Sequence, residues 1–261
     1  MISLLLMLLL SGVFCYFFNF IPLSPWYNFL WAPVSIILAI LCYLLFIVIF
    51  LGVTKKSKPT GKIRYKIARD IVKLIFILTN TKVEYVGKEN IPNETFVCYA
   101  NHKSAMDVFA IHYGLNSVCS VIGKKSLFKY PVIKNCQYTF GCIALDRESD
   151  RAAAKSMIEA MRNIKNGLSY IIFPEGTRNK TNEEILKARD GAYKLVTKTE
   201  VPLLPCTVIG TEGYSKRKTI LKKVKVKIVF HKPIYSEDYM KYNTSEISSQ
   251  VMEIIKNGLE L

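Results

Sequence analysis

The first 54 residues are almost entirely apolar, and none of them is Asp, Glu, Lys, Arg or His. Two long hydrophobic runs lie within them, at residues 2–20 and 34–53. A helix of about 20 residues spans about 30 Å, which is the thickness of the hydrocarbon core of a bilayer. The pattern therefore predicts a hydrophobic two-helix membrane hairpin over residues 1–54.

The residues that flank the two runs predict an orientation for this hairpin. Trp26, Tyr27 and Trp31 between the runs suit the headgroup level of a bilayer. Residues 55–69, directly after the second run, are rich in Lys and Arg, and the positive-inside rule places them and the following domain on the cytoplasmic face. Because the link is short, a hairpin that crosses the bilayer and one that enters a single leaflet both remain open.

Residues 55–80 are predicted to form a basic linker followed by an amphipathic helix. Apolar side chains recur at helical spacing between residues 65 and 79, with basic side chains between them. Such a helix either lies on a membrane surface or packs on the domain that follows.

From residue 81 onward, short apolar runs alternate with segments of helical spacing. The expected strands lie at residues 81–86, 95–99, 118–122, 141–145, 168–173, 203–209 and 224–230. The expected helices begin near residues 104 and 131 and cover 151–166, 185–198 and 245–259, with Gly167 and Ser245 as caps. This alternation predicts an α/β domain with a mixed, largely parallel sheet flanked by helices.

The net charge indicates which classes of partner the chain can bind. The net charge of +16 belongs entirely to the residues after position 54. Nucleic acid and an anionic membrane surface both attract such a chain. The adjacent hydrophobic hairpin favours the lipid bilayer, so no nucleic-acid partner is expected. The seven cysteines include no CxxC pair, so neither a disulfide framework nor a metal site is expected.

His102 and Asp107 are the first candidates for chemistry. A histidine near its ordinary pKa can take a proton at neutral pH, and a carboxylate behind it fixes its tautomer. The four residues between them leave room for a loop to turn into the first turn of a helix, so that the carboxylate folds back onto the ring. The alternatives are a helix start with an ordinary loop histidine, and a nucleophilic Cys98 in the preceding strand.

Residues 173–178, Phe-Pro-Glu-Gly-Thr-Arg, follow another buried strand. Pro174 and Gly176 predict a sharp turn at the strand's carboxyl end, where α/β sheets place ligands. Gly176 allows backbone amides to approach an anion, and Arg178 offers a planar fork for a phosphate. A surface turn with solvated charges is the alternative.

Two more strands deliver charged residues at their ends. Asp146 and Arg147 follow the strand at 141–145, where a simple salt bridge is the alternative to a ligand role. Lys124 lies in Gly-Lys-Lys-Ser-Leu, which lacks the upstream glycine of a P-loop because position 118 is Val. A nucleotide site is therefore not expected there, whereas a lysine that binds phosphate is.

Together these segments resemble the glycerolipid acyltransferases, specifically the 1-acylglycerol-3-phosphate acyltransferases. The NHxxxxD block stands at residues 101–107, a second block at 140–147, FPEGTR at 173–178 and a fourth block at 201–206. The resemblance covers roughly residues 60–235, and it implies that residues 81–261 form the acyltransferase domain.

The resemblance implies a role for each matching residue. His102 would be the general base, with Asp107 as its partner. Three basic side chains would hold the phosphate of the acceptor: Lys124, Arg147 and Arg178. Three further residues would shape the acceptor site: Glu175, Gly176 and Thr177.

The implied reaction moves an acyl chain from a thioester to the free hydroxyl of lysophosphatidic acid and gives phosphatidic acid. The donor would be acyl-CoA or an acyl-carrier protein, with no further cofactor and no metal. An enzyme of the same class could instead use glycerol-3-phosphate or another lysolipid. A catalytically inactive membrane adaptor, or a nucleic-acid-binding protein, is the alternative from a different class.

Overall fold

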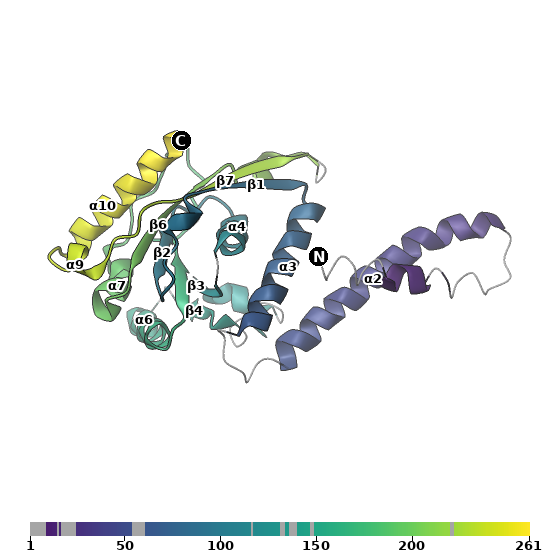
Figure 1. The fold of residues 1–261 in the computed structure, drawn as a ribbon, viewed down its shortest axis with the longest axis horizontal. Coiled ribbons are helices and arrows are strands. Elements are labelled where there is room, and N and C mark those ends of the chain that lie inside the picture. Colours follow the sequence, from purple (N-terminus) through teal and green to yellow (C-terminus); the bar gives the residue numbers. More distant parts are fainter. Residues whose placement is uncertain are drawn as a thin grey trace. The chain divides into compact units, whose positions relative to one another are not determined.

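The structure is a computed structural model, shown as a ribbon in Figure 1. It describes residues 9–14, 16, 25–53, 61–115, 117–130, 134–135, 140–146, 149–219 and 222–261. Contacts divide the chain into two compact units, Met1–Ser57 and Lys58–Leu261.

The first unit contains helix α2, Pro25–Val53, which includes the second predicted apolar run. Large apolar side chains such as Ile37, Leu41 and Leu45 are exposed on this helix. Most of the first predicted run, and the basic residues 55–60, lie outside the described residues. Among the residues that the structure fully describes, no helix is both long enough and apolar enough to cross a membrane.

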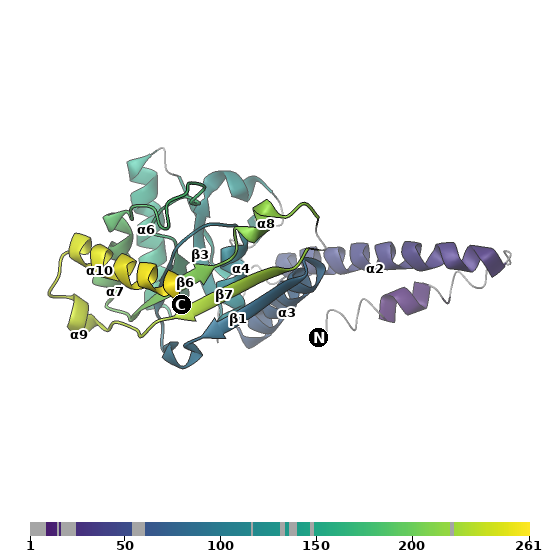
Figure 2. The ribbon, with the colours of Figure 1, turned by 90° about the horizontal axis from the view of Figure 1, so that it is seen from above.

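The second unit is built on a mixed sheet. In the described part of the chain, seven strands follow the order β1-β7-β6-β2-β5-β3-β4. Within this sheet every neighbouring pair is parallel except β6 and β7. The strands are β1 Thr81–Val86, β2 Val97–Ala100, β3 Cys119–Lys124, β4 Ile143–Leu145, β5 Ser169–Ile172, β6 Leu203–Ile209 and β7 Val224–Phe230. Figure 2 shows β1 and β7 running side by side.

Helices cover both faces of this sheet (Figure 1). One face packs against α3 (Lys62–Leu78) and α4 (Met106–Gly114), through an apolar core that includes Phe76 and Ile111. The other face packs against α6 (Asp150–Lys165), α7 (Lys194–Thr199) and α10 (Thr244–Asn257). The short helices α8 (Gly213–Lys216) and α9 (Ser236–Tyr239) lie in connections. Strand β2 serves both cores, since Cys98 faces the first and Tyr99 the second.

These elements confirm the predicted α/β class with a largely parallel sheet. Strands β1, β6 and β7 have the predicted bounds. The amphipathic helix predicted at 65–79 is α3, and it packs on the domain: Tyr65 Oη donates to the Leu115 carbonyl at 2.6 Å. The helix expected near residue 131 falls mostly outside the described residues.

The prediction of a helix over residues 185–198 is wrong for the first half of this segment. Only a 3-10 turn at Asp190–Tyr193 and the short helix α7 form there. The backbone N–H of Leu186 donates instead to the Glu175 carboxylate at 3.0 Å, and that of Arg189 to the Pro174 carbonyl at 2.9 Å. These long-range bonds hold residues 185–189 against the segment after β5, so no helical ladder begins there.

The last helix begins one residue earlier than predicted, and its cap is Asn243 rather than Ser245. The Asn243 side chain accepts from the backbone N–H groups of Ser245 and Glu246, and the Glu246 carboxylate accepts from the N–H of Asn243. This reciprocal capping box satisfies donors that a helix start otherwise leaves unpaired.

We expect Asn243→Ala to lower the free energy of unfolding by about 1 kcal/mol, because the helix loses its cap. Ser245→Ala is the matched control, and its effect should stay within about 0.5 kcal/mol because the hydroxyl is exposed. Denaturant unfolding of the two purified variants measures both values. Equal losses in the two variants would contradict the assignment of the cap.

Candidate active site

The predicted site residues that the structure describes lie along one edge of the sheet. Strands β6, β2, β5, β3 and β4 are mutually parallel neighbours, so their carboxyl ends share this edge, which we call the carboxyl edge. His102 follows β2, Glu175 follows β5, and Lys124 ends β3. Neighbouring strands lie about 4.8 Å apart, so the three segments are adjacent along the edge. This is where α/β sheets bind ligands.

The predicted contact between His102 and Asp107 is present. His102 Nδ1 lies 2.8 Å from Asp107 Oδ2. The same oxygen accepts the backbone N–H groups of Lys103 at 2.8 Å and Ser104 at 2.9 Å. The loop after β2 therefore closes around the first turn of α4, and a helix start favours a carboxylate there.

These contacts define what the imidazole can do. The Asp107 side chain is 0% exposed, whereas that of His102 is 17% exposed. An ionised carboxylate only accepts hydrogen bonds, so Nδ1 carries the proton that it donates. Nε2 of the neutral ring is then left with a lone pair, which is the atom a general base needs.

Glu175 holds the backbone of the histidine loop. One of its oxygens accepts from the His102 N–H at 2.7 Å, and the other accepts from the Leu186 N–H at 3.0 Å. The residue is buried, and burial raises the pKa of its carboxyl, while the two N–H donors act in the opposite direction. Both oxygens are thus engaged by the protein's own backbone.

Three contacts around the His102 loop were not predicted from the sequence. The Phe173 ring stacks on the imidazole with centroids 4.0 Å apart. The backbone N–H of Asn179 donates to the His102 carbonyl at 2.6 Å. Asn101 bonds both the N–H and the carbonyl of Val208 in β6, at 2.8 and 2.9 Å. All three contacts join segments more than 70 residues apart, which no local spacing reveals.

The turn after β5 has the conformation that its glycine predicted. Gly176 has a φ of 70°, and a Cβ there would lie 2.8 Å from Nε of Arg189. The positive φ favours glycine, and any larger residue would also displace the Arg189 side chain. Arg189 is a further cation at this turn, and no local pattern in the sequence marks it. Thr177 and Arg178 are exposed on the same turn.

The remaining predicted cations have different positions. Lys124 is exposed at the end of β3, two strands from His102. Arg147 lies outside the described residues. Asp146 pairs with Lys125 at 2.8 Å, a partner that the sequence did not predict.

Other reactive side chains are poorly suited to catalysis. Cys98 is 0% exposed, and burial raises the pKa of its thiol well above the usual value, so it does not supply a thiolate nucleophile. Burial lowers the pKa of His112 to about 4. The five described cysteines, Cys42, Cys98, Cys119, Cys142 and Cys206, are free thiols. No group of three His, Cys, Asp or Glu side chains able to hold a metal is found among the described residues.

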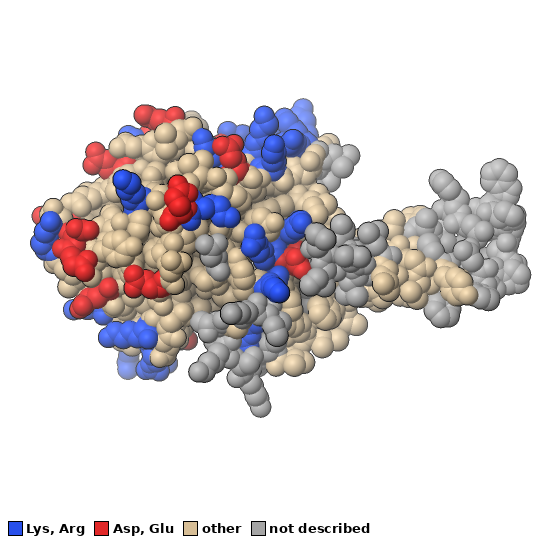
Figure 3. All heavy atoms as spheres, viewed as in Figure 1, with Lys and Arg blue, Asp and Glu red and all other residues tan. Residues whose placement is uncertain are grey.

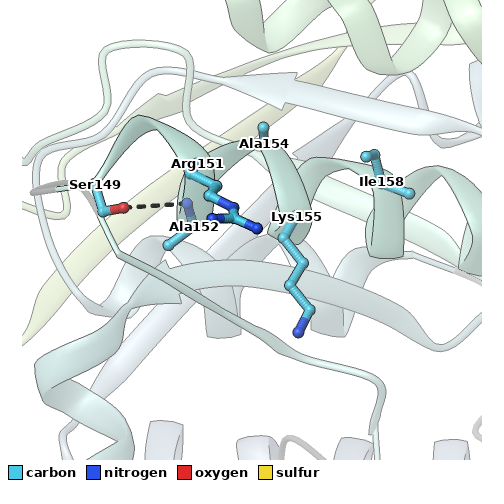
Figure 4. A pocket seen from close by; sticks show the side chains of 6 residues that line it. All are labelled: Ser149, Arg151, Ala152, Ala154, Lys155 and Ile158. Atoms are coloured by element: carbon cyan, nitrogen blue, oxygen red, sulfur yellow. Dashed lines mark hydrogen bonds between the residues drawn. The ribbon is translucent and has the colours of Figure 1, made fainter.

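A hollow of about 560 Å³ lies on α6 (Figure 4). Arg151, Lys155 and Ile158 line it, and the Ser149 hydroxyl caps the helix by accepting from the Ala152 N–H at 3.3 Å. Among the predicted site residues that the structure describes, none lines this hollow.

Comparisons with known proteins show what this sequence resembles. A family model described as Acyltransferase matches residues 82–209. A chloroplastic 1-acyl-sn-glycerol-3-phosphate acyltransferase of Brassica napus is 32% identical over 59% of this chain and 45% of its own length. The corresponding protein of Borreliella burgdorferi is 27% identical over 76% of this chain and 80% of its own. The chain thus spans less than half of the plant relative.

A solved structure extends the likeness to the fold. The crystal structure of the 1-acyl-sn-glycerophosphate (LPA) acyltransferase PlsC from Thermotoga maritima superposes with a TM-score of 0.65. It is 24% identical and covers 99% of this chain and 95% of its own, which shows a shared fold. The matched family model and these relatives make the chain similar to acyltransferases, among them 1-acyl-sn-glycerol-3-phosphate acyltransferases.

Proposed function

We propose that this protein transfers an acyl chain from a thioester to the free hydroxyl of 1-acyl-sn-glycerol-3-phosphate and so forms phosphatidic acid. The observation that carries the proposal is the His102–Asp107 hydrogen bond, which leaves Nε2 of a partly exposed ring free at the carboxyl edge. The named relatives support the acceptor.

The reaction follows from the groups present. Nε2 of His102 removes the proton of the acceptor hydroxyl as its oxygen attacks the thioester carbonyl carbon. A C–O bond forms, and the tetrahedral intermediate collapses with cleavage of the C–S bond. The imidazolium then returns its proton to the departing thiolate, so the enzyme ends unchanged. The Asp107 carboxylate stabilises the imidazolium between these two steps.

Cations at the carboxyl edge are proposed to select a phosphate-bearing acceptor. Arg178 is exposed beside the Gly176 turn, and Lys124 ends the strand next to β5. Arg147 completes the set proposed from the sequence, and Arg189 adds a guanidinium against Gly176. Guanidinium groups bind phosphate oxygens in pairs of charge-assisted hydrogen bonds.

The apolar first unit is proposed to hold the enzyme at a membrane. Exposed apolar side chains along α2, and the uncharged stretch of residues 1–54, support a membrane hairpin with the catalytic domain on the cytoplasmic face. The lipid bilayer would then supply the acceptor. The acyl donor is proposed to be acyl-CoA or an acyl-carrier protein, and no further cofactor takes part.

His102→Ala should lower thiol release from an acyl thioester by at least about 100-fold, because the base is lost. The assay compares detergent-solubilised wild type and variant, with and without lysophosphatidic acid. His231→Gln is the control and should keep most of the activity. His231 comes directly after the C-terminal end of β7, which lies away from the carboxyl edge. Full turnover by His102→Ala in a folded protein would exclude this mechanism.

Arg178→Ala should raise the KM for lysophosphatidic acid by roughly 10-fold to 100-fold with little change in kcat, because one charge-assisted phosphate contact is removed. Lys180→Ala is a matched control, because Lys180 is exposed two residues further along. Initial rates at saturating donor measure both constants. An unchanged KM in Arg178→Ala removes this residue from the acceptor site.

Glu175→Gln tests whether this residue positions the base or binds the acceptor. We expect kcat to fall roughly 10-fold to 100-fold with the KM for lysophosphatidic acid nearly unchanged, because the amide can accept only one of the two N–H donors and the His102 loop shifts. Histidine NMR signals of the variant report the displaced imidazole directly. A raised KM with an unaltered His102 signal would instead assign Glu175 to acceptor binding.

A further inference from the structure

The connection between β6 and β7 is strongly basic. From Glu212 to Glu237 the sequence contains no other acidic residue. Four lysines of this connection are exposed and form what we call the basic patch: Lys216, Lys218, Lys222 and Lys223. In the described part of the chain, none of them lies within salt-bridge distance of a carboxylate. Figure 3 shows Lys and Arg gathered near the end of the β1–β7 pair at which β7 begins.

Exposed apolar side chains lie beside this basic patch. Ile77 and Leu78, at the end of α3, are 51% and 53% exposed. Arg217 donates to the Thr79 carbonyl at 2.8 Å, and the Tyr214 and Thr81 hydroxyls are 2.7 Å apart. These bonds fix the end of α3 against the basic connection, so the lysines and the two apolar side chains belong to one surface.

This surface adjoins the His102 site. The connection begins at Gly210, directly after β6, and β6 pairs with β2. Asn101, the residue before His102, bonds Val208 near the end of β6. Because β7 is antiparallel to β6, the start of β7 also lies at the carboxyl edge. The lysines and apolar side chains therefore lie at the same carboxyl edge as His102.

We propose that the basic patch, with Ile77 and Leu78, is a docking surface for an anionic lipid bilayer, in addition to the membrane role proposed for the apolar first unit. Lysine ammonium groups attract anionic headgroups, and each one near a charged leaflet adds to the binding free energy. The two apolar side chains fit the boundary between headgroups and acyl chains, as in proteins that bind to the interface. A nucleic acid would match the lysines but would leave these apolar side chains against water.

Chemical labelling of lysines tests this proposal on the full chain. The protein is reconstituted in vesicles of phosphatidylcholine, alone or with one-third phosphatidylglycerol, and treated briefly with a water-soluble amine reagent. Mass spectrometry then compares the basic patch with three exposed internal controls towards the opposite edge: Lys194, Lys198 and Lys232.

Anionic vesicles should slow the labelling of the basic patch several-fold and leave the control lysines unchanged. This protection should disappear in about 1 M salt, where the Debye length falls to about 3 Å. Equal labelling in both kinds of vesicle would overturn the proposal. Protection by duplex DNA at matched charge, without protection by vesicles, would overturn it in favour of nucleic acid.

A matched pair of triple variants gives a functional reading, and this arm alone rests on the proposed function. One variant, K218Q/K222Q/K223Q, removes three charges from the basic patch. The other, K194Q/K198Q/K232Q, removes three charges towards the opposite edge. In anionic vesicles, the first should raise the KM for lysophosphatidic acid roughly tenfold and the second should not. Both should keep the wild-type kcat in neutral detergent micelles. Equal KM values in the two variants contradict the docking surface, whereas absent turnover in the wild type contradicts the proposed function and leaves the labelling result standing.

Discussion

The geometry of the candidate site depends on one buried oxygen, Oδ2 of Asp107. It accepts three N–H groups, two from the backbone of Lys103 and Ser104 and one from the ring of His102. Burying a carboxylate without such donors would cost folding free energy. The three N–H donors therefore stabilise the buried charge. The loop is thereby closed on the helix that follows it. The spacing of five residues reflects this closure, because the chain must leave β2 and turn into α4.

The sheet then fixes this loop from both sides. Glu175, after β5, holds the N–H of His102, while Asn101 reaches across to β6. Strand β2 lies between these two neighbours in the sheet, so the strand order itself determines which segments can support the base. The Phe173 ring stacked on the imidazole limits its rotation further. A charged turn and a histidine loop that are distant in sequence thus become one rigid arrangement.

The sequence predicted the features that depend on local patterns. Alternation of apolar runs located β1, β6 and β7, and the spacing of His102 and Asp107 anticipated their contact. It did not predict where backbone donors would find distant acceptors. Residues 185–189 have helical spacing, yet two of their backbone N–H groups donate to Glu175 and to the Pro174 carbonyl instead of forming a helix. The same holds for Glu175, whose two oxygens accept the distant backbone N–H groups of His102 and Leu186.

The one antiparallel pair in the described sheet has a consequence for the proposed reaction. If β7 ran parallel to β6, its first residues would lie at the amino edge, far from the base. Because it runs antiparallel, and β1 runs with it, the basic connection, the end of α3 and His102 all face the same edge. An acceptor that is both anionic and amphiphilic needs cations, apolar contacts and a base within reach of one interface. The mixed sheet provides that arrangement, which a wholly parallel sheet with the same strand order would separate.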